Sequence, residues 1–140
     1  MKKFLLAALL SLSSLTLSAG DTEFDCLVRN VYYESKSEPR NGKLAVALVT
    51  LNRVDNPKYP SSICGVVYQK GQFSWTSNKK IIKQKINKEQ WAAAKSAALE
   101  AFMNRGVLGN FYATHFHNNT VRPRWKLRLV TKIGNHKFYS

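Results

Sequence analysis

Few side chains in this sequence could act as a general acid, and Glu34 is the best placed of them. Apolar residues precede it at helical spacing: Phe24, Leu27, Val28, Val31 and Tyr32. Glu34 follows Val31 by three positions, which puts it at the edge of that apolar face. Partial burial raises the pKa of a carboxyl group and suits it to donate a proton near neutral pH. The alternative is an ordinary surface glutamate paired with a lysine.

The other acids offer Glu34 little help. Only Glu38 and Asp55 could act with it, because Glu89 and Glu100 fall in a predicted surface helix. A glycosidase of the usual kind needs two carboxylates across the scissile bond. One carboxylate suffices for a lytic transglycosylase, where it protonates the glycosidic oxygen and then takes the proton of the sugar's own C6 hydroxyl. The scarcity of acids favours this second chemistry, which needs no cofactor.

The three histidines suggest a different chemistry. His115 and His117 alternate along a strand-like segment, so both imidazoles would lie on one face, and His136 could be a third ligand. Three histidines and one open position make a catalytic zinc site, in which Glu34 would be the base of an N-acetylmuramoyl-L-alanine amidase. A His-x-His pair alone is a weak signal, and the same imidazoles could form the hydrogen-bonding wall of a polar cleft without any metal.

Aromatic side chains could supply platforms for sugar rings, because an aromatic face stacks on an apolar sugar face. Four residues are predicted to be exposed enough for this role: Phe73, Trp75, Trp125 and Tyr139.

Three helices are predicted to position Glu34. The first ends at Ser35. Thr22 and Asp25 have the spacing of a capping box and mark its start. After a loop over residues 36–42, residues 43–54 are apolar nearly all round and are expected to be the central buried helix. Residues 89–105 form the third, which Gly106 ends. Its buried stripe is predicted to contain Trp91, Ala94, Ala97, Ala98, Ala101 and Phe102.

Beyond Gly106 the apolar period changes to two, which is typical of strands. Residues 111–118 alternate so that Phe111, Ala113, His115 and His117 share one side. Residues 127–133 and 136–139 are predicted to form a hairpin that turns at Gly134 and Asn135. The expected fold class is α+β, a mainly helical domain with a short C-terminal hairpin or sheet.

The first 20 residues have the features of a secretory signal: a basic start, an apolar stretch and small residues before Asp21. We expect residues 1–20 to be removed, with an uncleaved anchor as the alternative, and residues 21–140 to form a single catalytic domain. Export favours a disulfide between Cys26 and Cys64. A catalytic thiol at Cys64 is the alternative.

The chain is strongly basic, with a formal net charge of +14 that falls by two when Lys2 and Lys3 leave with the signal. Such a charge predicts a polyanionic partner. Export excludes nucleic acid and favours the anionic cell envelope, with peptidoglycan glycan strands as substrate, in the periplasm, the cell wall or outside the cell. A non-catalytic cationic protein that binds the wall is a further alternative. The protein is expected to be a monomer.

Several motifs, in order along most of the chain, resemble those of the cell wall hydrolase family typified by the spore cortex-lytic enzyme. They are Tyr33-Glu34-Ser35-Lys36-Ser37-Glu38-Pro39, Gly42, Ala45-Val46-Ala47, Leu51-Asn52-Arg53-Val54, Tyr59-Pro60, Ile63-Cys64-Gly65-Val66-Val67-Tyr68-Gln69, Gln72-Phe73-Ser74-Trp75, Thr114-His115-Phe116-His117, Pro123 with Trp125, and Ile133-Gly134-Asn135-His136-Lys137-Phe138-Tyr139.

The resemblance implies a small lysozyme-like α+β domain that acts as a lytic transglycosylase between N-acetylmuramic acid and N-acetylglucosamine. It places Glu34 at the position of the family's catalytic glutamate. We expect eight further residues to bind substrate, because they match family motifs and supply aromatic faces or hydrogen-bonding groups: Phe73, Ser74, Trp75, His115, His117, Asn118, Trp125 and His136.

The sequence departs from the family pattern in two respects. The family usually has Ala-Arg-Gly after the glutamate, where this chain has Ser35, Lys36 and Ser37. The small residue and the cation are kept, so modest consequences are expected. The separate wall-binding domain of the spore enzymes is not among these 140 residues, so the basic surface is expected to serve in wall targeting. Specificity for spore cortex is not expected to carry over.

Overall fold

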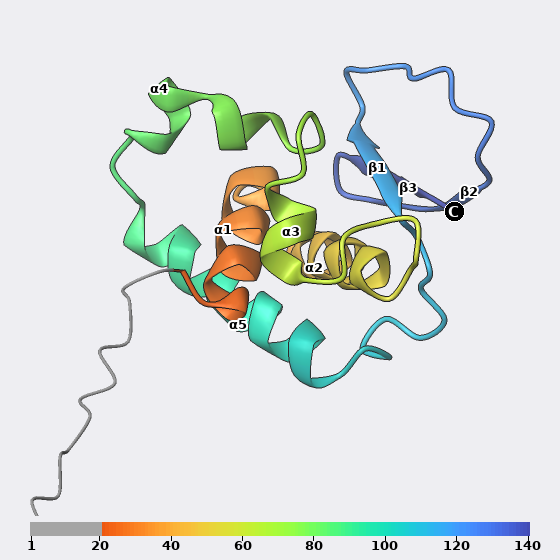
Figure 1. Cartoon of the computed structure of the whole chain (residues 1–140), viewed down its shortest axis with the longest axis horizontal. Helices are drawn as coiled ribbons and strands as arrows, with labels where there is room; N and C mark the ends of the chain where they lie inside the picture. Colours follow the sequence, from red (N-terminus) through yellow and green to blue (C-terminus); the bar gives the residue numbers. More distant parts are fainter. Residues whose placement is uncertain (1–20) are drawn as a thin grey trace, which may run out of the picture.

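The computed structural model describes residues 21–140, and the predicted secretory signal lies outside them. The elements are the helices α1 (Glu23–Ser35), α2 (Arg40–Val54), α3 (Ile63–Val67), α4 (Lys79–Ile82) and α5 (Lys88–Met103), the 3-10 helix η1 (Ser74–Ser77), and the strands β1 (His115–Asn118), β2 (Leu129–Ile133) and β3 (His136–Tyr139). The predicted α+β class is confirmed (Figure 1). None of the helices in residues 21–140 has the length and apolarity needed to cross a bilayer.

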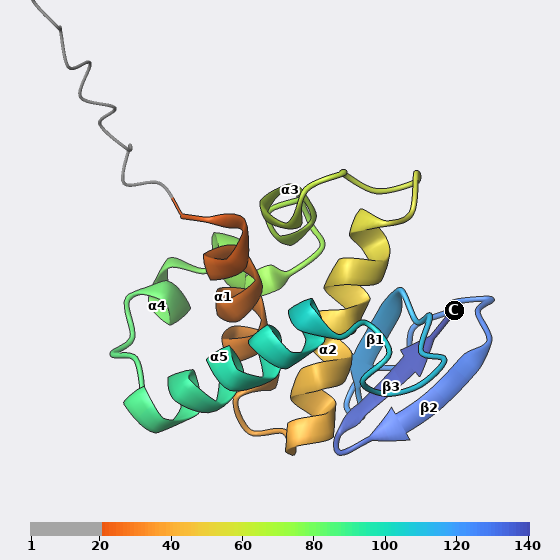
Figure 2. The same cartoon turned by 90° about the horizontal axis from the view of Figure 1, so that it is seen from below.

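Helix α2 is the central element, as predicted. It lies between the other helices and the sheet (Figure 2), and its residues 42–51 are all buried. The helix begins at Arg40, three residues before the predicted start, because Pro39 takes the N-cap position and has no N–H that needs a partner. A Cβ atom at Gly42 would lie 3.1 Å from Cβ of Glu38, so glycine allows the preceding loop to fold closely over this first turn.

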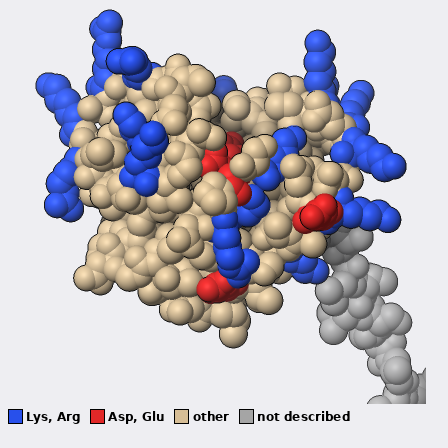
Figure 3. Space-filling model, turned by 180° about the vertical axis from the view of Figure 1, so that it is seen from behind, with Lys and Arg blue, Asp and Glu red and all other residues tan. Residues whose placement is uncertain are grey.

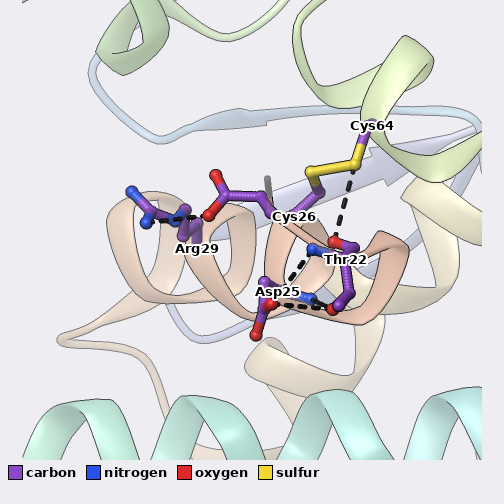
Figure 4. A network of polar contacts seen from close by, with 6 residues as sticks. Thr22, Asp25, Cys26, Arg29 and Cys64 are labelled. Carbon is purple, nitrogen blue, oxygen red and sulfur yellow. Dashed lines mark hydrogen bonds and ion pairs between the residues drawn. A yellow bond between two sulfur atoms is a disulfide. The ribbon is translucent and has the colours of Figure 1, made fainter. Parts of the chain in front are cut away.

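Helix α1 is anchored at its start by two devices that the sequence predicted. Thr22 and Asp25 form the capping box, with each side chain accepting a hydrogen bond from the other's backbone N–H. Cys26 and Cys64 form the disulfide, with their Cα atoms 5.3 Å apart (Figure 4). The alternative prediction of a catalytic thiol at Cys64 is therefore wrong, and the disulfide links α1 covalently to α3.

Helix α5 packs against α1 and α2 through its alanines. Ala94, Ala97, Ala98 and Ala101 are completely buried, as predicted. Phe102 is 44% exposed, so its place in the buried stripe is wrong. Alanine lets the helices approach closely and leaves no space for a large ring between them. The Phe102 ring lies at the margin instead, edge-on to Phe24 with ring centroids 5.9 Å apart.

The three strands form an antiparallel sheet in the order β1-β3-β2. The predicted hairpin turn is confirmed, with Gly134 at a φ of 56°. The first strand is shorter than predicted, because Asn52 on α2 binds the backbone just before it. The Asn52 side-chain nitrogen donates to the carbonyls of Phe111 and Ala113, at 3.1 and 2.9 Å. A side chain thus takes the place of a neighbouring strand there.

The hairpin turn is docked on the loop between α1 and α2. The backbone N–H of Asn135 donates to Oε2 of Glu38 at 2.9 Å. A Cβ atom at Gly134 would lie 2.0 Å from that same oxygen, so only glycine fits this contact. Because this loop follows α1 directly, the turn places the sheet beside the end of that helix.

Candidate active site

A cleft of about 550 Å³ lies between the end of α1, the segment around η1 and the sheet. It is lined by Tyr33, Glu34, Gly71, Gln72, Ser74, Trp75, Ile81, Phe116, His117, Asn118, Val121 and His136. Glu34 is the only acid among these residues. The cleft therefore brings one carboxyl group to a polar and aromatic surface built from three separate parts of the chain.

Glu34 lies in the last turn of α1 and is half-buried. No residue in 21–140 donates a hydrogen bond to its carboxylate or forms an ion pair with it. Burial is the main influence on its pKa, which rises from 4.5 to about 7, while the charge of Arg53 acts in the opposite direction. A carboxyl group with such a pKa can give up and take back a proton near neutral pH.

Lys43 holds the end of the helix that carries Glu34 through hydrogen bonds to backbone carbonyls. This side chain is only 6% exposed. Its ammonium group donates to the backbone carbonyls of Ser35 and Lys36, at 2.8 and 3.3 Å, and to that of Glu38. The carbonyls of Ser35 and Lys36 are at the C-terminal end of α1, where they have no partner inside the helix and attract a cation, and that of Glu38 belongs to the loop that follows. Lys43 thus fixes the position of the turn from which Glu34 projects.

Arg53 at the end of α2 supplies the positive charge near Glu34. Its Nε donates to the carbonyl of Thr114 at 2.7 Å, and one terminal nitrogen donates to Gln72 at 3.3 Å. The guanidinium also lies over the rings of Tyr59 and Phe73, 5.2 and 5.3 Å from their centroids. Sequence reasoning did not assign Arg53 to the site, although it belongs to the Leu51-Asn52-Arg53-Val54 motif.

Trp75 forms a rigid wall of the cleft and is not the exposed platform that the sequence predicted. It is 4% exposed, and its indole N–H donates to Oδ1 of the buried Asn30 at 2.9 Å. Asn30 in turn donates to the hydroxyl of Thr50 at 3.1 Å. A buried indole needs such a partner, and this one pulls the ring into the core.

Tyr33 covers the outer side of Trp75. The two rings are stacked, with centroids 4.5 Å apart and planes 22° from parallel. Tyr33 is half-buried and adjoins Glu34 in the chain, so its ring lies in the cleft where the sequence suggested Trp75 would be. Sequence reasoning missed it, although the residue stands in the same family motif as Glu34.

The structure brings together six of the nine residues predicted for the site: Glu34, Ser74, Trp75, His117, Asn118 and His136. Phe73 is 4% exposed and supports Arg53 from inside, so its prediction as a sugar platform is wrong. His115 and Trp125 do not line the cleft. Trp125 is 41% exposed and lies edge-on to His115, His117 and Tyr139, with ring centroids 5.1, 5.6 and 5.7 Å away.

The three histidines do not converge, so the zinc site is not supported. In the strand register His117 pairs with Lys137, and His136 pairs with Asn118. Successive strand residues face opposite sides, so His136 lies on the other face of the sheet from His115 and His117. No three His, Cys, Asp or Glu side chains within residues 21–140 are arranged to hold a metal ion.

His136 is an inward-facing wall residue. It is 6% exposed, and its Nδ1 has no hydrogen-bond partner in the described part of the chain. Burial lowers its pKa, against the opposing influence of Glu38. The imidazole is therefore neutral near pH 7.

Neither of the two acids that could have assisted Glu34 lines the cleft. Glu38 accepts the hydrogen bond from the hairpin turn at Asn135. Asp55 pairs with Arg105 at 3.3 Å on the surface. The cleft therefore has no second carboxylate within residues 21–140 that could activate a water molecule.

The surface of the described residues is strongly basic. On the face drawn in Figure 3, lysine and arginine side chains project along much of the margin, and acidic side chains occupy only small areas. Three of the acids in residues 21–140 form ion pairs with arginines, namely Asp21, Glu100 and Asp55. Most of the positive charge is thus uncompensated and faces solvent.

Comparisons with known proteins identify relatives of this chain. The family described as Cell Wall Hydrolase matches residues 37–139, which begin just after Glu34. A spore cortex-lytic enzyme of Bacillus cereus is 30% identical over 121 residues, covering 85% of this chain and 44% of the relative. One from Bacillus subtilis is 29% identical over 121 residues, covering 85% and 38%. The chain thus spans less than half the length of these curated relatives.

A solved structure covers the same region. The catalytic domain of the germination-specific lytic transglycosylase SleB from Bacillus anthracis is 29% identical, with a TM-score of 0.70 over 89% of this chain and 100% of that domain. The likeness confirms the expected lysozyme-like α+β class.

Proposed function

This chain belongs to the cell wall hydrolase family, and we propose that it is a peptidoglycan lytic transglycosylase. Glu34 is its single general acid and base, and the bond it breaks is the β-1,4 bond from N-acetylmuramic acid to N-acetylglucosamine. The observation that carries this proposal is the isolation of Glu34: it is the only acid on the cleft, and burial raises its pKa to about 7.

In the first step the Glu34 carboxyl group gives its proton to the glycosidic oxygen. The bond from that oxygen to C1 of the muramic acid breaks, and the N-acetylglucosamine leaves with a free O4 hydroxyl. In the second step the O6 hydroxyl of the same muramic acid attacks C1, and its proton goes to the Glu34 carboxylate. The product carries a 1,6-anhydro ring, Glu34 is protonated again, and no water is consumed.

The surroundings of Glu34 suit both steps. The half-buried position favours the protonated form that begins the cycle. The nearby guanidinium of Arg53 stabilises the carboxylate that exists between the steps. It forms no ion pair with Glu34 that would keep the carboxyl group deprotonated. Ser74, Asn118, His117 and His136 offer hydrogen-bonding groups to the sugars, and Tyr33 offers a ring face supported by Trp75.

Product analysis tests the reaction. Purified sacculi treated with the protein should release muropeptides that end in 1,6-anhydro-N-acetylmuramic acid, detected by mass spectrometry as species one water lighter than the hydrolytic products. Reducing ends labelled from ¹⁸O water would show hydrolysis instead. Released stem peptides would point to the amidase alternative, whose activity a chelator should abolish. No soluble product, together with binding to sacculi, would favour the non-catalytic wall-binding alternative.

The pH dependence should report the protonation of Glu34. Only the protonated carboxyl group can start the reaction, so kcat/KM should be level at low pH and fall as the pH rises through about 7. The initial rate on solubilised glycan strands, measured between about pH 5 and 9, gives this profile. Circular dichroism at each pH serves as the control for folding. A rate independent of pH across this range would contradict the assignment of Glu34 as the acid.

The proposed substrate is part of the cell wall, so the protein must reach the wall to act. We propose that residues 1–20 direct export and that residues 21–140 form a single catalytic domain that acts as a monomer. Its net positive charge attracts it to polyanions, and export makes the anionic envelope, not nucleic acid, the polyanion that it meets. The same charge would increase its residence on the wall polymer, because encounters with an anionic polymer are favoured by long-range attraction.

A further inference from the structure

A second hollow of about 310 Å³ adjoins the Glu34 cleft on the outer side of the sheet. The two share His117 and Val121 in their walls. The second hollow is further lined by Arg122, Lys137 and Tyr139. A polymer bound in the cleft could therefore send a side branch past His117 into this space.

The charges of the second hollow are of one sign. Arg122 and Lys137 contribute two cations, and no acid lines it. Neither cation forms an ion pair with any acid of residues 21–140, and all eight acids of the chain lie within those residues. The two cations are thus available to a ligand, and a guanidinium is well shaped to bind a carboxylate through two hydrogen bonds.

The wall between the two hollows is held in a defined position. Nδ1 of His117 lies 2.7 Å from the backbone carbonyl of Asn118, so in the neutral ring it carries the proton and donates it. Nε2 then accepts from the hydroxyl of Tyr139 at 2.8 Å. The Tyr139 ring also stacks on the imidazole, with centroids 5.2 Å apart. These contacts fix the ring at the junction and leave Arg122 and Lys137 as the groups that select a ligand.

We propose that this hollow is a subsite for a carboxylate of the peptide stem attached to N-acetylmuramic acid. The inference rests on the proposed function, because that function puts a muramic acid in the adjoining cleft. In peptidoglycan the stem branches from the lactyl group of this sugar and carries free carboxylates. A basic hollow that opens from the glycan cleft fits such a branch, whereas the glycan backbone itself has no charge to place there.

Binding to a cleavage-deficient protein tests the subsite separately from catalysis. The probe is a fluorescent uncrosslinked glycan strand with peptide stems, used with its carboxylates free and after amidation by carbodiimide and ammonia. In the Glu34→Gln background, fluorescence anisotropy should show about tenfold tighter binding of the free-carboxylate strand. Addition of Arg122→Gln and Lys137→Gln should reduce that preference to less than about twofold.

The matched control is Arg124→Gln with Lys126→Gln. It removes two charges from the segment between β1 and β2, which also contains Arg122, and neither residue lines the hollow. This variant should keep most of the preference, because the loss of long-range attraction alone is small in salt. Thermal unfolding of each variant verifies that it is folded.

Three results would overturn the subsite: equal binding of the two strands by the Glu34→Gln protein, a preference that survives loss of Arg122 and Lys137, or its loss in the control variant. A wild-type protein that shows the binding preference but releases no anhydro products would leave the subsite standing and refute the transglycosylase.

Discussion

Replacement of Glu34 by glutamine should lower the release of anhydro-muropeptides by about 10³-fold, because the amide can neither donate the proton to the glycosidic oxygen nor accept one from O6. Glutamine has nearly the same size, so the walls of the cleft should be unchanged. The initial rate of release from sacculi, followed by mass spectrometry, measures the loss. A non-catalytic wall-binding protein would behave alike with either residue.

Glu38→Gln is the matched control for charge. Glu38 is four positions further along the chain, and its carboxylate accepts a hydrogen bond from the Asn135 N–H that an amide oxygen can also accept. We expect this variant to keep activity within a few-fold of the wild type. A loss in Glu38→Gln as large as that in Glu34→Gln would show that general disruption, and not the missing acid, explains the result.

Glu34→Gln should also change how the stability of the protein depends on pH. The pKa of Glu34 is higher in the folded protein than its ordinary value of 4.5. The folded protein therefore holds a proton that the unfolded chain loses, so the stability due to this group is complete below about pH 4.5 and declines as the pH rises to about 7. Glu34→Gln should remove this decline. A wild-type-like pH dependence of unfolding in the variant would contradict the raised pKa.

Removal of the disulfide should cost about 4 kcal/mol of unfolding free energy, because the bridge joins residues 38 positions apart and restricts the unfolded chain accordingly. The double variant Cys26→Ala and Cys64→Ala, compared with wild type by urea denaturation, measures this cost. Cys26 is buried, so part of the loss would come from packing. Wild type unfolded with and without a reductant separates the two contributions.

Catalysis should depend on the bridge only through folding. The disulfide is at the start of α1, eight residues before Glu34, while Lys43 and the hairpin turn hold the other end of that helix. Below its unfolding temperature the double variant should therefore have a kcat close to that of the wild type. A reduced protein with unchanged unfolding free energy would show that the bridge contributes nothing to stability.

Local patterns in the chain were enough to identify most of the elements. The capping box at Thr22 and Asp25, the alanine stripe of α5 and the turn at Gly134 depend on residues close together in sequence, and each was found where its pattern predicted. The errors arose where a distant group intervened. Asn52 satisfies the backbone before β1, which shortens that strand, and Asn30 binds the indole of Trp75, which draws that ring into the core.

The sequence by itself was sufficient to determine that Glu34 stands at the edge of an apolar helix face, with few other acids to assist it and two cysteines able to pair. Only the tertiary structure decided which residues surround Glu34. It buried Phe73 and Trp75, brought the charge of Arg53 near the carboxyl group, stacked Tyr33 on Trp75 in the cleft, and placed His136 on the other face of the sheet from His115. The physical reason is that periodicity reports which face of an element is buried, whereas the neighbours across a cleft depend on how separate elements pack and on hydrogen bonds between residues far apart in the chain.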